Sequence, residues 1–259
     1  MKVFFIGDIV GSSGRDVFEK HIPAMKASGE VDVVVANAEN AAGGSGITER
    51  IAKELFGQGC DVITLGDHVW DKREVYPYLN EETRILRPAN FSPQAPGHGS
   101  CVIEIKSGIR VGVMVLLGRT FIKYPTDCPF LALDRLFKEL RQLTPNIIVD
   151  IHAEATSEKV AMGWYADGRV SAVLGTHTHI QTADEKILPQ GTAYITDVGM
   201  TGPYDSVIGQ MKERIVERYL TGLPNKFEVA AGVATLCGVI IDIDETTGKA
   251  RGIERVQKL

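Results

Sequence analysis

Residues 3–26, VFFIGDIVGSSGRDVFEKHIPAMK, decide the fold class of this chain. The apolar run Val3 to Ile6 predicts a buried strand, and a glycine-rich turn that contains Asp8 follows it. Arg15 to Lys26 then carries apolar residues at the spacing of an amphipathic helix. A strand, a polar turn and a helix in this order form the repeating unit of a layered α/β domain.

The turn after the first predicted strand contains three glycines, Gly7, Gly11 and Gly14. Their spacing does not match the glycine fingerprint of dinucleotide-binding folds. We therefore predict that these glycines allow two backbone segments to approach each other closely around Asp8.

The same unit recurs along the chain. Further apolar runs predict buried strands at Val31 to Ala36, Val62 to Leu65, Val111 to Leu117, Ile147 to Ile151, Val170 to Leu174 and Ala193 to Thr196. Helical periodicity between them predicts helices at Thr48 to Phe56, Leu131 to Leu143, Glu154 to Trp164 and Gln210 to Leu220. Near the end of the chain, Ala234 to Ile243 and Ala250 to Val256 flank a turn. They predict a C-terminal β-hairpin.

The composition favours one α/β domain over residues 1–259. Of the 259 residues 44% are hydrophobic, which is enough to form a substantial core. No low-complexity linker, internal repeat or charge block marks a boundary between domains. Residues 88–100 are rich in proline and glycine, and we predict that they form an ordered surface loop near the functional site.

The charge of the chain excludes one class of function. The formal net charge is −5, and no run of lysine or arginine builds a positive stripe. Proteins that hold long nucleic acids mainly by counterion release need such a stripe, so long duplex DNA or RNA is not an expected partner. A small phosphorylated ligand stays open, because bound cations would supply local positive charge.

Cysteine spacing and apolar run lengths predict a cytoplasmic protein without a membrane partner. The four cysteines form no CxxC pair, so we expect reduced, buried thiols. The apolar run at the N-terminus is too short for the core of a signal peptide. The longest later run, Val111 to Leu117, is far shorter than a membrane span.

Residue types that bind metals follow the predicted strands. These residues are Asp8, Glu39, Asn40, Asp67, His68, His152, His177 and His179. Each alone has an ordinary interpretation as a polar residue near a strand end. Loops after parallel strands converge on ligands at one edge of an α/β fold, and five such strand ends in one chain favour a shared metal site. His21 and His98 lie outside this pattern.

The ligand types indicate phosphate ester chemistry. Hydrolysis of a phosphodiester needs positive charge on the phosphoryl oxygens, an activated water and a proton for the leaving oxygen. Two metal ions roughly 3.5 to 4 Å apart supply the first two. Mixed imidazole and carboxylate ligands suit iron, manganese or zinc and disfavour calcium. A carboxylate bridges two cations well, and we predict that Glu39 is the bridge.

Five segments in order resemble the calcineurin-like metallophosphoesterase superfamily: GDIVG, NAEN, LGDH, DIHAE and GTHTH. Longer segments narrow the resemblance to the YmdB-like branch, which is regarded as a group of cyclic-nucleotide phosphodiesterases. These segments are NAENAAGG, RPANF, HAEATSEK, GTHTHIQTAD and TDVGMTGPYDSVIG. The resemblance covers nearly the full chain, and it implies a central β-sandwich flanked by helices.

The resemblance also implies roles for the site residues. One metal would be held by Asp8, Glu39, Asn40 and His179, and the other by Glu39, Asp67, His152 and His177. His68 would lie beside the phosphate as general acid, while a metal-bridging hydroxide attacks phosphorus. The implied substrate is a small phosphodiester, with a 2′,3′-cyclic nucleotide favoured and short RNA ends as another candidate. The family also implies a homo-oligomer.

Three positions depart from the superfamily pattern. The first motif usually reads Asp-x-His, but Val10 stands in place of the histidine, and Asn40 is its expected substitute. The bridging acid is usually Asp, whereas this chain has Glu39. The third motif more often has Asn where Asp67 stands, so Asp67 adds a full negative charge to the second metal position.

Other roles stay open at the level of sequence. Glu154, Asp197 and Thr201 either orient ligands and substrate or serve as turn and cap residues. Two other functions share the same site: a metal- and nucleotide-binding regulatory protein with weak catalysis, and a phosphomonoesterase.

Overall fold

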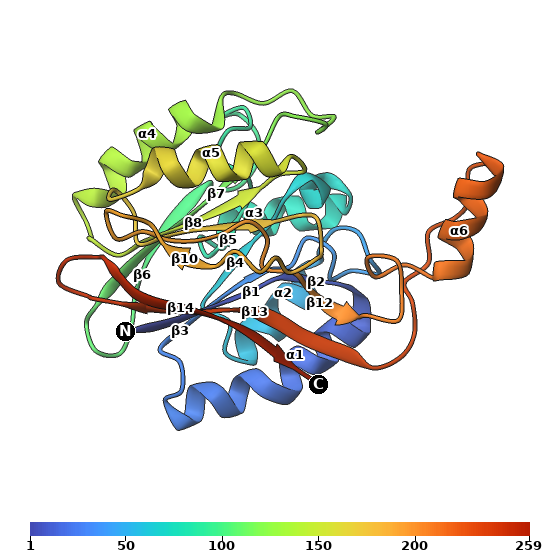
Figure 1. The fold of residues 1–259 in the computed structure, drawn as a ribbon, viewed down its shortest axis with the longest axis horizontal. Helices are drawn as coiled ribbons and strands as arrows, with labels where there is room; N and C mark the ends of the chain where they lie inside the picture. Colours follow the sequence, from blue (N-terminus) through green and yellow to red (C-terminus); the bar gives the residue numbers. More distant parts are fainter.

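The computed structural model describes all residues from 1 to 259, and it contains two β-sheets with helices on their outer sides (Figure 1). The helix α1 (Gly11–Ser28) lies on one side of the molecule, and α4 (Pro129–Arg141) and α5 (Thr156–Ala166) lie on the other. The layers therefore run helix, sheet, sheet, helix. This arrangement confirms the predicted α/β sandwich.

The first sheet has eight strands. Seven of them are ordered β2-β12-β13-β1-β3-β4-β5, and β14 pairs with β13. Their bounds are β1 (Lys2–Ile6), β2 (Asp8–Ile9), β3 (Val33–Asn37), β4 (Val62–Thr64), β5 (Ile85–Leu86), β12 (Met200–Pro203), β13 (Ala234–Ile243) and β14 (Ala250–Lys258). Strands β1, β3, β4 and β5 are parallel, whereas β13 runs antiparallel to β1 and β14. The predicted C-terminal hairpin is thus confirmed, and it forms part of this sheet.

The second sheet has six strands in the order β10-β11-β9-β8-β7-β6. Their bounds are β6 (Ser100–Glu104), β7 (Arg110–Leu117), β8 (Ile147–His152), β9 (Ala172–Thr176), β10 (Lys186–Ile187) and β11 (Ala193–Ile195). The four central strands are parallel, and the two edge strands run antiparallel to their neighbours. Parallel strands end at one common edge, and this edge carries the site residues.

Successive side chains of a strand point to opposite faces of the sheet, and in these strands both faces are buried. Val3 and Phe5 of β1 pack between the two sheets, whereas Phe4 and Ile6 pack with the helix side chains of the first outer layer. In β7, Val113 faces the space between the sheets. Met114 and Leu116 of β7 pack on the other face, against residues of α4 and α5. Strands that are buried on both faces need apolar residues at every position.

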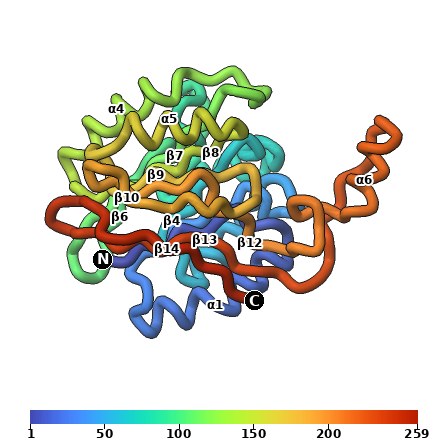
Figure 2. The backbone as a smooth tube through the Cα atoms, viewed as in Figure 1, coloured from blue at the N-terminus to red at the C-terminus, as the bar shows by residue number.

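Three further helices complete the fold. The helix α2 (Glu49–Gly57) begins after Thr48, whose side chain accepts a hydrogen bond from the Ile51 backbone N–H at 3.3 Å. A short helix, α3 (Tyr76–Glu81), follows two 3₁₀ turns, η1 (Asp67–Trp70) and η2 (Arg73–Val75). The helix α6 (Lys212–Thr221) projects from the body of the molecule (Figure 2). Ile215 is its one buried residue.

Most predicted elements are present with ends shifted by one or two residues, but α1 begins at Gly11 and not at Arg15. The prediction placed the glycines in the turn, yet Gly11 and Gly14 belong to the helix. A Cβ on Gly14 would lie 2.4 Å from the Thr201 carbonyl oxygen, and a Cβ on Gly7 would lie 2.0 Å from that of Gly199. The predicted close backbone approach is therefore confirmed at the junction of β1, α1 and β12.

Several short elements were not predicted from the sequence, namely β2, β5, β6, β10, β12, α3 and the 3₁₀ turns. Strands of two to five residues that lie near sheet edges carry too few residues to show a period. The predicted surface loop at residues 88–100 is ordered, but Pro88 to Phe91 are buried. Phe91 packs edge-on against Trp70 of η1, with ring centroids 5.3 Å apart, which brings the loop close to the element that begins with Asp67.

The four cysteines are free, and Cys60 and Cys237 are buried whereas Cys101 and Cys128 are partly buried. No helix is long and apolar enough to cross a bilayer.

Candidate metal centre

The predicted site residues lie at the carboxyl ends of strands from both sheets. In the first sheet, Asp8 follows β1, Glu39 and Asn40 follow β3, and Asp67 opens η1 after β4. In the second sheet, His152 is the last residue of β8, and His177 and His179 follow β9. Because the two sheets pack face to face with these ends at the same edge, residues far apart in the chain converge there.

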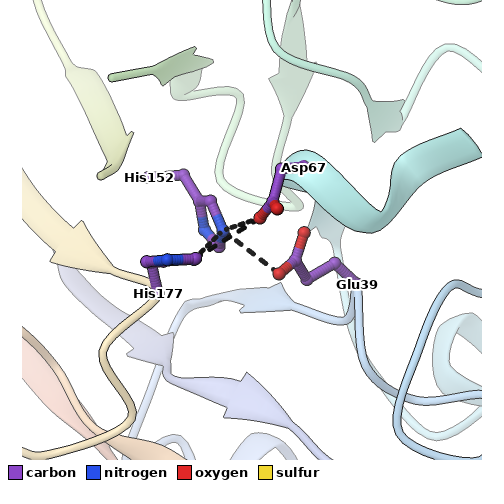
Figure 3. Close-up of side chains that lie close together, drawn as sticks. All are labelled: Glu39, Asp67, His152 and His177. Atoms are coloured by element: carbon purple, nitrogen blue, oxygen red, sulfur yellow. Dashed lines mark hydrogen bonds and ion pairs between the residues drawn. The ribbon is translucent and has the colours of Figure 1, made fainter. Parts of the chain in front are cut away.

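Four of these side chains form a tight cluster. Glu39, Asp67, His152 and His177 each offer one ligand atom, and these atoms all lie within 4.8 Å of one another. His152 Nε2 is 3.1 Å from Glu39 Oε1 and 3.3 Å from Asp67 Oδ1. His177 Nδ1 is 3.1 Å from His152 Nε2. Figure 3 shows the four side chains pointing toward one another.

Asp8, Asn40 and His179 form a second group beside this cluster. His179 Nε2 lies 3.7 Å from Asp8 Oδ1 and 3.2 Å from Asn40 Nδ2. Asn40 Nδ2 in turn lies 3.4 Å from Glu39 Oε1. Glu39 therefore contacts members of both groups.

Three observations test whether these residues fit bound cations. Asp8 Oδ1 is buried and has no hydrogen-bond partner. His152 Nε2 and His177 Nδ1 face each other at 3.1 Å, although neutral imidazole nitrogens need a donor or a cation between them. A Cβ on Gly66 would lie 2.2 Å from His152 Nε2, so the absence of a side chain leaves room at this point. The carboxylates, imidazoles and single amide fit metal ions that accept nitrogen and oxygen ligands.

Comparison with known proteins places the chain among its relatives. The family model described as YmdB-like protein matches residues 4–256. The chain belongs to the YmdB-like family. A Bacillus subtilis (strain 168) protein named 2′,3′-cyclic-nucleotide 2′-phosphodiesterase is 51% identical over 256 residues, which cover 99% of this chain and 96% of the relative.

Two solved structures are similar over the whole length of this YmdB-like chain. A hypothetical protein from Thermus thermophilus has a TM-score of 0.93 and 42% identity, and the match covers 100% of this chain and 99% of the other. A novel phosphatase from Mycoplasma pneumoniae has a TM-score of 0.92 and 35% identity, with 100% and 93% covered. The predicted resemblance to the YmdB-like branch is confirmed.

In this YmdB-like chain, three histidines of the site have their second ring nitrogen held by the protein: His152, His177 and His179. His179 Nδ1 lies 2.9 Å from the Ile208 carbonyl oxygen, and His177 Nε2 lies 3.0 Å from Glu154 Oε2. His152 Nδ1 lies 2.8 Å from Thr176 Oγ1. Such contacts fix the ring and the tautomer, so that the other nitrogen presents its lone pair to the centre.

The three residues whose roles the sequence left open, Glu154, Asp197 and Thr201, differ in their contacts. Glu154 contacts His177, which supports its role in orienting a ligand. Thr201 Oγ1 instead donates to the Cys237 carbonyl oxygen and accepts from the Cys237 N–H, both at 3.1 Å, so Thr201 braces the sheet. Asp197 binds Thr178 in the turn between His177 and His179.

Asp150 is a site residue that the sequence reasoning missed. Its carboxylate is fully buried and accepts hydrogen bonds from Thr64 Oγ1 at 2.6 Å, Thr176 Oγ1 at 2.7 Å and Asn37 Nδ2 at 3.3 Å. Burial raises the pKa of Asp150 to about 6. Because Thr176 also contacts His152, Asp150 holds the threonine that orients this histidine. The segment DIHAE could have indicated this role, because Asp150 and His152 are two positions apart in a strand and therefore share a face.

His68 lies at the edge of the cluster. Its backbone N–H donates to Glu39 Oε2 at 2.9 Å, and its ring Nδ1 lies 2.7 Å from Asp71 Oδ2. Ser45 Oγ lies 3.2 Å from the same ring nitrogen. Neither Asp71 nor Ser45 was predicted, because neither follows a strand end.

Burial and the neighbouring charges shift the pKa values of several groups in the metal-free site. Burial raises the pKa of Asp8 above its usual 3.8. Burial by itself lowers the pKa of His152, but the charge of Glu39 and the hydrogen bond to Asp67 outweigh it and hold this pKa well above 6.5. The same contacts lower the pKa of Glu39 and Asp67 against the effect of burial. The carboxylates of the site therefore favour a positive charge at the position of His152 Nε2.

We expect the metal-free protein to lose stability as the pH rises above 6.5, the ordinary pKa of histidine. A raised folded-state pKa gives stability that is complete below the unfolded pKa and is lost as the pH rises through the folded value. This applies to His152, with an ordinary pKa of 6.5, and to Asp8, with 3.8. The lowered pKa values of Glu39 and Asp67 matter only below 4.5 and 3.8. Urea unfolding of chelator-treated protein measures this dependence, and a stability that rises with pH over this range contradicts it.

Proposed function

We propose that this chain is a dinuclear metal-dependent phosphodiesterase that hydrolyses small phosphodiesters, with 2′,3′-cyclic nucleotides as its substrates. One observation carries the proposal: two groups of metal-ligand residues meet at one sheet edge, and Glu39 contacts both. The chain is a phosphoric ester hydrolase, since it belongs to a family whose relatives are named phosphodiesterase and phosphatase. The name of the Bacillus relative supports the cyclic-nucleotide substrate.

The residues divide between two metal positions. Asp8, Glu39, Asn40 and His179 would hold one ion, and Glu39, Asp67, His152 and His177 would hold the other. Iron and manganese fit this ligand set best, and zinc fits it as well. Bound ions of this kind offset the charge of the phosphoryl oxygens and lower the pKa of a water molecule. The oriented imidazoles keep the positions rigid, because each second ring nitrogen already has a partner.

His68 would supply the proton for the leaving oxygen. The carboxylate of Asp71 lies 2.7 Å from His68 Nδ1, so it stabilises the protonated imidazole and fixes the ring. His68 Nε2 has no hydrogen-bond partner within the chain, so it is free to donate a proton to substrate. The hydrogen bond from the His68 N–H to Glu39 ties the acid to the ligand that contacts both groups.

The test is hydrolysis of 2′,3′-cyclic AMP by protein loaded with manganese or iron. We expect turnover that disappears on chelation and returns on metal addition. A phosphomonoester, p-nitrophenyl phosphate, run in parallel separates a diesterase from a monoesterase. Tight nucleotide binding without product, measured by calorimetry, would favour the regulatory alternative and overturn the proposed reaction.

Replacing Asp67 with asparagine is expected to weaken metal retention by about tenfold, roughly 1.4 kcal/mol, while turnover persists. Asp67 Oδ1 lies 3.3 Å from His152 Nε2 and 3.4 Å from His177 Nδ1, so its charge acts directly on the second metal position. An amide holds a cation less tightly but also neutralises less of its charge. Metal content after dialysis and kcat at saturating metal give the two quantities. If both are unchanged, Asp67 is not a ligand.

A further inference from the structure

A buried ion pair lies directly behind the turn that carries two of the site histidines. Lys159 Nζ on α5 is 2.6 Å from Asp197 Oδ2, and the two side chains are 1% and 0% exposed. Asp197 lies between β11 and β12. Charges at such depth are costly to bury unless they are paired and fully hydrogen-bonded. The pair lies outside the proposed metal ligands, so its presence calls for a different role.

Besides the ion pair with Lys159, the carboxylate of Asp197 accepts three hydrogen bonds, and two of them come from Thr178. Oδ2 accepts from the Thr178 N–H at 3.1 Å and from Thr178 Oγ1 at 2.6 Å, while Oδ1 accepts from the Gly199 N–H at 2.9 Å. Together with Lys159 this gives four donors to one carboxylate. The four donors hold the carboxylate in one orientation, and the Lys159 ammonium is the charged partner among them.

Thr178 separates His177 from His179 in a turn of unusual conformation. The φ angles of His177 and His179 are +98° and +66°, a region that residues other than glycine rarely adopt. Such a conformation persists only where surrounding contacts determine it. The His177 N–H reaches Asp8 Oδ2 at 3.3 Å, and the His179 ring reaches Ile208. Asp197 is the contact that holds the residue between the two histidines.

The end of β9, directly before this turn, packs against the aliphatic part of Lys159. A Cβ on Gly175, two residues before His177, would lie 3.0 Å from Lys159 Cδ and 1.7 Å from the Thr196 carbonyl oxygen. The absence of a side chain at Gly175 therefore lets β9 approach both α5 and the segment that carries Asp197. Three separate parts of the chain meet behind the histidine turn.

We propose that Lys159 and Asp197 form a positioning pair that sets the His177–Thr178–His179 turn and thereby aims one imidazole at each of the two metal positions. Lys159 fixes the carboxylate of Asp197, and Asp197 holds Thr178. Neither residue touches metal or substrate. The proposal rests on the proposed metal site, because His177 and His179 are assigned there to different ions.

Hydrogen exchange tests the pair without any metal. In chelator-treated protein, the Thr178 amide proton is expected to exchange at least about tenfold faster in Asp197→Asn than in the original chain, because its acceptor loses charge. Asp167→Asn is the matched control, since Asp167 is also a buried carboxylate that accepts backbone N–H groups, from Gln190 and Thr192. An unchanged rate at Thr178 in Asp197→Asn overturns the proposal.

Metal affinity then tests the consequence. Calorimetric titration with Mn²⁺, at a temperature where each variant is folded, is expected to show binding about tenfold to a hundredfold weaker in Asp197→Asn and in Lys159→Met. The double variant is expected to lose less Mn²⁺ binding free energy than the two single variants lose together, because no unpaired charge remains in it. Thr178→Val removes one donor at constant shape, and a several-fold loss of affinity is expected.

The possible results distinguish a failure of the positioning role of Lys159 and Asp197 from a failure of the proposed metal site. A lower melting temperature with unchanged Mn²⁺ affinity in the folded variants assigns the pair a structural role and overturns the proposal. Strictly additive losses in the double variant overturn the coupling of the two residues. An original chain that binds no Mn²⁺ overturns the metal site itself, and the exchange of Thr178 still reports whether Asp197 holds the turn.

Discussion

Replacing Glu39 with glutamine is expected to lower kcat/KM for 2′,3′-cyclic AMP by about a thousandfold or more, which corresponds to roughly 4 kcal/mol of transition-state stabilisation. Glu39 is 1% exposed, and its Oε1 lies 3.1 Å from His152 Nε2 in one group and 3.4 Å from Asn40 Nδ2 in the other. Glutamine keeps the volume but loses the charge and one acceptor oxygen. Asn40 also contacts members of both groups, but its side chain carries no charge, so we expect it not to replace the bridge.

Metal content identifies the cause of this loss. Elemental analysis of Glu39→Gln is expected to show fewer bound ions per chain than in the original protein. Asp167→Asn again provides the control, because it removes a buried carboxylate at the far end of α5 without contact to either group. Normal turnover by Glu39→Gln would remove Glu39 from the mechanism.

Replacing His68 with alanine is expected to lower kcat for 2′,3′-cyclic AMP by about a hundredfold to ten-thousandfold while Mn²⁺ affinity stays nearly constant. The reason is that the ring of His68 contacts Asp71 and Ser45 and none of the proposed ligands. Burial by itself lowers the pKa of His68, but the charge of Glu39 and the hydrogen bond to Asp71 raise it above 6.5, which favours the protonated form. The backbone N–H that binds Glu39 is present in alanine as well.

The leaving group distinguishes a general acid from a binding residue. A ribose oxygen needs a proton as it departs, whereas p-nitrophenolate does not. The rate of His68→Ala on bis(p-nitrophenyl) phosphate is therefore expected to fall by less than about tenfold. His98→Ala serves as a control, because His98 lies outside the site and contacts the Asn80 carbonyl oxygen. Equal losses on both substrates would show that His68 does not protonate the leaving group.

The sequence determined the layers of the fold and the place of the proposed ligands at strand ends. Strands such as β7 and β8 are buried on both faces, so they appear in the sequence as uninterrupted apolar runs. A ligand residue placed directly after such a run must lie at the carboxyl edge of the sheet. Asp8, Glu39, Asp67 and His152 could be found in this way, since strand and ligand are neighbours in the chain.

Only the tertiary structure decided which residues support the ligands. Asn37 reaches Asp150 across 113 positions of sequence, and Lys159 reaches Asp197 across 38. Asp71 and Ser45 meet at His68 because a 3₁₀ turn and the loop after Asn40 lie side by side. These contacts follow from the packing of two sheets and α5 against one another, and no local period or spacing encodes that packing. Hydrogen bonds between distant segments exist only once the hydrophobic layers have brought those segments together.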